Sequence, residues 1–257
     1  MQAAVAEDGL GLPPEFSLVA LGAIDGTNAE AVRRAEAGVA DGTLIWAREQ
    51  TAGRGRRGRT WTSPPGNFYA SLLLRPECAP ADAGQLGFVT AVALREAILD
   101  AMPEAGGIEL KWPNDLLAGG RKLAGILLES RLTGSRRLDW LVIGTGVNVA
   151  SHPEDAGRPA TSLATLGGPP PVPVLLSAYG RAMAAWLARW REEGFAPVRL
   201  AWLRHAAGRD GRLQARLAGE TIEGRFADLD ETGALMLELP DGALRRVLAG
   251  EVFALPG

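Results

Sequence analysis

Residues 53–61 read Gly53-Arg54-Gly55-Arg56-Arg57-Gly58-Arg59-Thr60-Trp61, and they directly follow a segment, 43–49, whose composition predicts a β-strand. The glycines between the arginines allow backbone angles that other residues rarely adopt, so this loop is able to approach a ligand closely. The guanidinium groups are forked, permanently charged donors that suit carboxylate and phosphate. The run therefore predicts an anion-binding loop, here called the Arg/Gly loop.

Two later stretches carry matching chemistry. They are Lys111-Trp112-Pro113-Asn114-Asp115 and Arg121-Lys122-Leu123-Ala124-Gly125-Ile126. We expect all three to converge on one site that holds an anionic small molecule and the phosphates of a nucleotide. A short Arg-rich run is also typical of a nucleic-acid patch or a solvated loop. The net charge of −3 and the pI of about 5.6 argue against a nucleic-acid partner, because such domains are usually strongly basic.

The composition is that of an ordinary globular protein. The chain has 257 residues, of which 47% are hydrophobic and 22% charged. Cys78 is the only cysteine, so an intrachain disulfide is excluded and a reducing compartment is favoured. The first 14 residues lack the features of a secretory signal, and no apolar stretch is long enough to span a bilayer. We therefore expect a cytoplasmic protein with no membrane partner.

Apolar periodicity and turn residues predict an α+β fold. The expected strands cover 16–24, 43–49, 67–74, 108–112, 116–118, 122–131 and 138–149, and the expected helices cover 28–39, 82–102, 174–191 and 197–206. Thr27 and Glu30 have the spacing of a capping box at the start of the first helix. Short glycine turns between strands predict a mixed, mostly antiparallel sheet that is covered by helices.

The predicted domain organisation follows from changes along the chain in composition and in the length of the predicted elements. Residues 1–14 are expected to form a loose leader and residues 15–208 the main domain. Four short alternating segments at 213–217, 221–229, 235–239 and 245–248 predict a small β-barrel domain over 209–257. The stretch 151–171 is rich in proline, glycine and alanine, and its part up to residue 163 either folds over a ligand or is a flexible surface loop.

Taken together, the motifs resemble those of the biotin–protein ligases. Two further segments match that family: Gly144-Thr145-Gly146-Val147-Asn148-Val149, and Asp25 to Glu30 with Gly26 in place of the family's serine. The resemblance runs from about Phe16 to the C-terminus. It implies a class II synthetase-like catalytic domain followed by an SH3-like β-barrel. Too few residues precede Phe16 for the family's N-terminal DNA-binding domain, so the resemblance is to the short form.

The resemblance implies a reaction in two steps. The carboxylate of biotin attacks the α-phosphate of ATP, which gives biotinyl-5′-AMP and pyrophosphate. A lysine of a biotin carboxyl carrier domain then attacks this adenylate, and AMP leaves. Fixed positive charge would bring the two anions together and stabilise the charge that develops, and Mg²⁺ would accompany the triphosphate.

The resemblance also assigns roles to individual residues. The catalytic residues would be Arg56, Lys111, Asp115 and Lys122. Biotin would contact Gly26, Thr27, Asn28, Gln50, Arg54, Gly55, Arg56, Lys122 and Gly125. ATP and the adenylate would contact Arg54, Arg56, Arg59, Trp61, Lys111, Asn114, Lys122 and Asn148. Gly26 removes one expected hydroxyl contact to the ureido ring, and no metal ligand from the protein is assigned, since His152 and His205 lack metal-site spacing.

Several alternatives remain open from the sequence. The nearest is a lipoate or octanoate ligase or transferase of the related fold. A different class is a non-catalytic nucleic-acid-binding protein that uses the basic loop. A separate alternative concerns single residues: Asn114 and Asp115 merely shape the turn after Pro113. The family resemblance also makes a homodimer an option.

Overall fold

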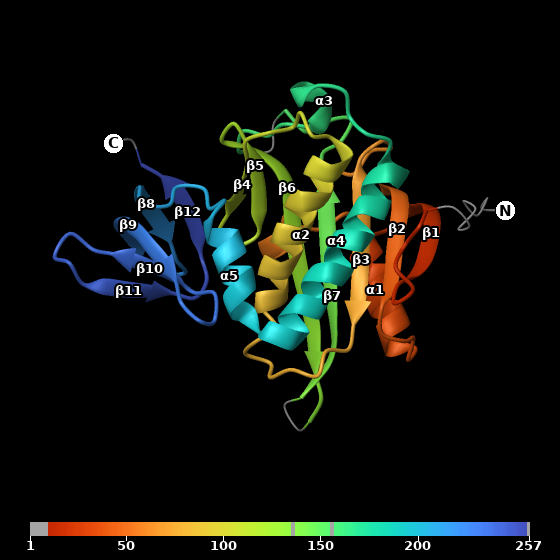
Figure 1. The fold of residues 1–257 in the computed structure, drawn as a ribbon, viewed down its shortest axis with the longest axis horizontal. Coiled ribbons are helices and arrows are strands. Elements are labelled where there is room, and N and C mark those ends of the chain that lie inside the picture. Colours follow the sequence, from red (N-terminus) through yellow and green to blue (C-terminus); the bar gives the residue numbers. More distant parts are fainter. Residues whose placement is uncertain (1–9, 135–136, 155–156, 256–257) are drawn as a thin grey trace.

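The computed structural model describes residues 10–134, 137–154 and 157–255 (Figure 1). It has a seven-stranded mixed sheet covered by helices and a five-stranded antiparallel sheet nearer the C-terminus. This arrangement confirms the predicted α+β class. Residues 1–9 of the expected leader lie outside the described residues, and the boundaries 1–14, 15–208 and 209–257 stay predictions.

The main sheet has one parallel pair of strands and is otherwise antiparallel. Its order is β1 (Ser17–Ile24), β2 (Thr43–Gln50), β3 (Phe68–Leu74), β7 (Leu138–Val147), β6 (Arg121–Leu132), β5 (Asp115–Ala118) and β4 (Ile108–Lys111). Strands β1 and β2 run parallel because helix α1 (Thr27–Glu36) returns the chain between them. Strands β4, β5 and β6 follow one another through short turns, and the β5–β6 turn contains the predicted Gly119-Gly120 pair.

The helices divide unequally between the two faces of the sheet. One face is covered by α2 (Gln85–Ala101) and α4 (Val172–Glu193), with α5 (Phe195–Leu203) beside them (Figure 1). In the described residues, no helix is both long and apolar enough to cross a membrane. The opposite face packs against α1 through a smaller cluster that includes Ala31, Ala35, Ile45, Leu73 and Val142. Two short helices, η1 (Arg56–Gly58) and α3 (Leu163–Leu166), lie in connections.

Strand alternation explains where a ligand has room. Successive side chains of a strand point to opposite faces, so Gly144 and Gly146 share the α1 face with Val142. Thr145 points the other way, and its hydroxyl lies 3.1 Å from that of Tyr179 on α4. The α1 face therefore has glycines where the other face has a packed helix.

The predicted capping box is wrong. Gly26 is the N-cap of α1, and no side chain caps this end of the helix. Thr27 is already the first helical residue, and its hydroxyl faces Gln50 and Ser71. The carboxylate of Glu30 binds Arg33 and Arg34. Thr27 therefore takes tertiary partners in place of the cap, and Glu30 takes ion-pair partners one turn further along the same helix.

The C-terminal sheet has the order β11 (Leu244–Val247), β10 (Leu235–Glu238), β9 (Thr221–Leu229), β8 (Arg212–Arg216) and β12 (Glu251–Ala254). Four of its strands match the predicted alternating segments. Strand β12 and helix α3 were not predicted from the sequence. Pairing with β8 establishes this strand.

The two sheets are joined by a shared aromatic core. The ring centroid of Phe88 on α2 lies 5.4 Å from that of Trp202 on α5, and Trp202 lies 6.4 Å from Phe226 of the C-terminal sheet. The indole of Trp112 donates to the carbonyl oxygen of Gly233 at 3.1 Å. These contacts hold the C-terminal strands against the end of the main sheet.

Gly233 provides a test of this junction. It has a φ of +87°, and a Cβ there would lie 2.6 Å from the ring of Phe88. We expect Gly233→Ala to lower the free energy of unfolding by about 3 kcal/mol, about 1 from the backbone angle and about 2 from the clash. Gly242→Ala is the matched control, since its φ is +84° and nothing lies within 4 Å of its Cβ. Equal losses for the two variants in urea unfolding would contradict the role of Phe88.

Candidate active site

A cavity of about 460 Å³ lies on the α1 face of the main sheet. The Arg/Gly loop, the β4–β5–β6 segment and the start of β12 surround it. All of the site residues predicted from the sequence line this cavity: Gly26, Thr27, Asn28, Gln50, Arg54, Gly55, Arg56, Arg59, Trp61, Lys111, Asn114, Asp115, Lys122, Gly125 and Asn148. The three separate motifs therefore converge in space.

Both lysines of the chain line this cavity. Lys122 lies on β6, and its ammonium group donates to Oδ1 of Asp115 at 2.6 Å. Asp115 is buried at the start of β5, so this carboxylate balances the charge of Lys122 inside the protein. The ammonium group also lies 5.4 Å from the ring centroid of Trp61, where a cation is attracted by the face of the indole.

Lys111 has a different environment at the end of β4. Burial lowers the pKa of its amine below the ordinary value, and the charge of Asp115 opposes this shift. Strand pairing places Lys111 opposite Asp115, and the amine lies 5.3 Å from the ring centroid of Phe253 on β12. The cavity thus contains two lysines with distinct electrostatic surroundings.

The Arg/Gly loop is held in shape by its own backbone. The N–H of Trp61 donates to the carbonyl of Gly53 at 2.9 Å, and that of Gly55 donates to Arg59 at 2.7 Å. Arg57 adopts a left-handed φ of 56° between these contacts. A Cβ on Gly53 would lie 2.4 Å from the carbonyl oxygen of Trp61, so only glycine fits there.

Arg56 is the half-buried arginine of this loop. Its guanidinium donates to Oδ1 of Asn114 at 2.9 Å, and the amide of Asn114 donates to the carbonyl of Ile126 at 2.7 Å. Burial lowers the pKa of Arg56 below its ordinary value, but a guanidinium remains charged in proteins. Asn114 therefore holds the arginine and also ties the β4–β5 turn to β6.

Gln50 and Thr27 meet at the opposite end of the cavity. The backbone N–H of Thr27 donates to Oε1 of Gln50 at 2.8 Å. The amide nitrogen of Gln50 donates to the hydroxyl of Ser63 at 2.9 Å. These two contacts determine the orientation of the Gln50 amide.

Two glycines of β7 form part of the cavity floor. A Cβ on Gly146 would lie 2.7 Å from the indole of Trp61, and one on Gly144 would lie 2.1 Å from the side-chain oxygen of Asn28. The Gly-x-Gly spacing places both on one face of the strand. The close approach of Asn28 and Trp61 to the sheet therefore requires glycine at both positions.

The 157–163 stretch packs against β6 through backbone hydrogen bonds. The N–H of Lys122 donates to the carbonyl of Pro159 at 2.9 Å, and the N–H of Thr161 donates to the carbonyl of Lys122 at 2.9 Å. The amide of Asn148 donates to the carbonyl of Thr161 at 3.0 Å. The side-chain nitrogen of Asn148 is thereby engaged within the protein.

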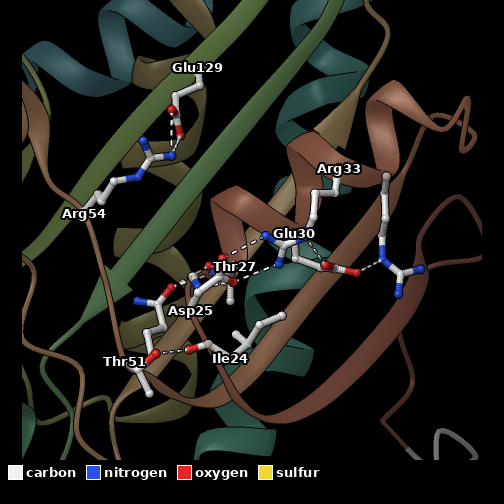
Figure 2. Close-up of polar contacts among 11 residues, drawn as sticks. Ile24, Asp25, Thr27, Glu30, Arg33, Thr51, Arg54 and Glu129 are labelled. Atoms are coloured by element: carbon white, nitrogen blue, oxygen red, sulfur yellow. Dashed lines mark hydrogen bonds and ion pairs between the residues drawn. The ribbon is translucent and has the colours of Figure 1, made fainter.

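Sequence reasoning missed several charged residues of this region. Glu251, at the start of β12, binds Arg59 at 2.6 Å and also pairs with Arg158. Glu129 on β6 binds Arg54 at 3.1 Å (Figure 2). No local pattern marks either carboxylate. Glu129 lies 75 residues from Arg54 in the chain, and Glu251 belongs to the C-terminal sheet. Only the fold brings these carboxylates to the arginines.

This arrangement suits the binding and activation of anions. Arginines and lysines surround a cavity large enough for a small ligand. Among the described residues there is no group of three or more His, Cys, Asp or Glu that would hold a metal ion.

Comparison with known proteins shows related sequences along both sheets. Residues 26–148 match the Biotin/lipoate A/B protein ligase family, and residues 210–255 match the Biotin protein ligase C terminal domain. The biotin–[acetyl-CoA-carboxylase] ligase of Paracoccus denitrificans is 42% identical over 242 residues, which cover 89% of this chain and 97% of the relative.

Solved structures show the same architecture. Biotin protein ligase from Aquifex aeolicus in complex with biotin and ATP has a TM-score of 0.79 and 27% identity, and the match covers 94% of this chain and 99% of that one. The enzyme from Leishmania major in complex with biotinyl-5-AMP has a TM-score of 0.64 and 27% identity, covering 92% of this chain and 100% of that one.

The environment of Lys111 leads to a pH-dependent prediction. Its pKa is lowered, so more of its amine is unprotonated at neutral pH than in an ordinary lysine, and it should be acylated faster than its exposure alone predicts. Asp115→Asn removes a charge that raises this pKa, so the pKa should fall further. Each unit of that fall raises the reactive fraction about tenfold below the midpoint.

The measurement is simple because the chain has two lysines. Acetylation by an N-hydroxysuccinimide ester is followed over a pH series by peptide mass spectrometry. Asp139→Asn serves as the control, since Asp139 binds Arg75 and Arg131 outside the cavity. A lower Lys111 acetylation rate in Asp115→Asn than in the parent protein would contradict the electrostatic account.

Proposed function

The chain belongs to the biotin–protein ligase family, and on that premise we propose how its cavity carries out the reaction. The activity of this family forms biotinyl-5′-AMP and transfers biotin to protein. The observation that carries the proposal is the convergence of Arg56 and Lys122 on one cavity from different segments. Two anions that repel each other need such a cluster of fixed positive charge to react.

The first step joins biotin to the nucleotide. A carboxylate oxygen of biotin attacks the α-phosphorus of ATP, and the bond from that phosphorus to the bridging oxygen breaks, releasing pyrophosphate. Arg56 and Lys122 stabilise the negative charge that builds up on the phosphate oxygens. Lys111 and Arg59 add positive charge at the nucleotide, and ATP enters as its magnesium complex, since Mg²⁺ is commonly bound through substrate phosphates.

The second step passes biotin to a carrier protein. The ε-amine of a lysine in a biotin carboxyl carrier domain attacks the carbonyl carbon of the adenylate, and AMP leaves with the bonding electrons. Asp115 orients this amine or accepts its proton. Its hydrogen bond to Lys122 supports such a role, because the carboxylate already faces the cavity.

The ligand contacts follow the two ends of the cavity. The biotin ring lies at the α1 end, and the carboxylate and nucleotide lie toward the cations. Biotin contacts Gly26, Thr27, Asn28, Gln50, Arg54, Gly55, Arg56, Lys122 and Gly125, and the nucleotide contacts Arg54, Arg56, Arg59, Trp61, Lys111, Asn114, Lys122 and Asn148. A Cβ on Gly125 would lie 3.2 Å from the ammonium group of Lys122, so glycine keeps this part of the cavity open.

The relatives favour biotin over lipoate or octanoate. The family matched by residues 26–148 includes both biotin and lipoate ligases by name. The C-terminal domain family and the relatives named above are those of biotin ligases alone. Pairing of two copies of the chain stays a prediction.

Biotin-dependent exchange of labelled pyrophosphate into ATP tests the first step directly. We expect Arg56→Ala and Lys122→Ala each to lower the exchange rate about 100-fold or more, because each removes charge stabilisation in the transition state. Arg181→Ala is the control, since Arg181 binds Asp100 and Ser177 on the helical layer. Exchange at the background rate in the parent protein would contradict the adenylation step. Full exchange in the two cavity variants would show that Arg56 and Lys122 do not act in it.

Gly26→Ser tests whether the missing family hydroxyl affects affinity. Gly26 has an extended φ of −173°, and the nearest atoms to a Cβ there lie 3.8 Å away, so serine fits without strain. One added hydrogen bond of about 1 kcal/mol lowers the KM for biotin about fivefold. Gly26→Ala fits equally well but adds no hydroxyl. An unchanged KM for serine relative to alanine would show that this contact is already supplied.

A further inference from the structure

Glu129 ends a chain of hydrogen bonds that leads into the biotin end of the cavity. Its carboxylate accepts from the amide nitrogen of Asn28 at 2.7 Å and from Arg54 at 3.1 Å. The hydroxyl of Ser71 lies 2.6 Å from the amide oxygen of Asn28 and 2.8 Å from the hydroxyl of Thr27. Figure 2 shows Glu129 and Arg54 facing each other, with Thr27 at the start of α1.

The carboxylate imposes a direction on this chain. An ionised carboxylate accepts hydrogen bonds and donates none, so the Asn28 side chain must turn its nitrogen toward Glu129. Its oxygen then faces Ser71, which has a single proton. At 2.6 Å two oxygens repel unless a proton lies between them, so Ser71 donates its proton to Asn28.

Thr27 is then left without a proton for a ligand. Its hydroxyl lies 2.8 Å from Ser71 and 3.1 Å from Oε1 of Gln50. Neither neighbour donates to it, because Ser71 has given its proton to Asn28 and Oε1 of Gln50 is an acceptor. The single proton of Thr27 goes to one of these two oxygens, and only lone pairs remain.

We propose that Glu129 is a positioning and specificity-determining residue that makes the Thr27 hydroxyl an acceptor for an N–H group of the ligand. This inference rests on the proposed function, in which the ligand is the ureido ring of biotin. Glu129 acts from a distance, through Asn28 and Ser71. Ligands with an oxygen in place of that N–H would meet a second acceptor and be rejected.

Glu129→Gln removes the constraint while keeping the shape of the side chain. The amide of glutamine is able to donate to Asn28, whose own amide then turns over and donates to Ser71. Ser71 in turn donates to Thr27, so the Thr27 proton no longer has to lie between Thr27 and Ser71 and is shared between Oε1 of Gln50 and the ligand. The same chain of contacts therefore runs in the reverse direction in this variant.

The probes are biotin and its two cyclic carbamate analogues, in each of which one ureido N–H is replaced by oxygen. Their Kd values are measured by calorimetry on the full chain. We expect the parent protein to bind one analogue at least about tenfold more weakly than biotin, since an acceptor would face an acceptor. In Glu129→Gln this ratio should fall to about threefold or less.

Ser71→Ala provides a second variant that breaks the chain at its middle, and it should lower the ratio in the same way. Glu30→Gln is the matched control, because the Glu30 carboxylate binds Arg33 and Arg34 on the same helix and should leave the ratio unchanged. General damage to the fold would weaken all three ligands together and leave the ratio as it was.

A parent-like ratio in both Glu129→Gln and Ser71→Ala would overturn the inference, as would equal binding of biotin and both analogues by the parent protein. Loss of the proposed function would look different. The parent protein would then neither bind biotin nor exchange pyrophosphate.

Discussion

Carboxylates hold the cations of the cavity in place, one from the adjacent strand of the same hairpin and two from distant segments. The pairs are Lys122 with Asp115, Arg54 with Glu129, and Arg59 with Glu251. Without these partners the cations would repel each other across a half-buried cavity. Each arginine of these pairs has a side chain about half exposed, so its ion pair is weak in water. A ligand with several negative charges is therefore able to compete for the same guanidinium groups.

The two β7 glycines have a complementary effect on the floor of the cavity. A strand normally presents a side chain every second residue, which would fill the α1 face of the sheet. Gly144 and Gly146 leave that face bare, and Asn28 and Trp61 occupy the space. Polar and aromatic groups thus reach the ligand from the loop and the helix, while the strands supply a rigid base. Helices α2 and α4 fill the opposite face, where the strands have large side chains.

Sequence reasoning worked best where the chemistry is local. The Arg/Gly loop and the strands beside it could be predicted because residue type and spacing determine them. It failed at the first helix, where Thr27 and Glu30 have a capping-box spacing but contact other residues. A side chain near a helix start has both local and tertiary partners, and the sequence does not show the second kind. Strand β12 was missed for a similar reason, because its pairing with β8 establishes it.

The sequence by itself determined the α+β class, the family resemblance and the three motifs that meet at the cavity. Those features depend on composition, periodicity and motif order, all of which are properties of the linear sequence. Only the tertiary structure decided which carboxylate faces which cation, and in which direction the hydrogen bonds run from Glu129 to Thr27. These properties depend on distances between groups far apart in the chain, and such distances exist only after the strands have packed.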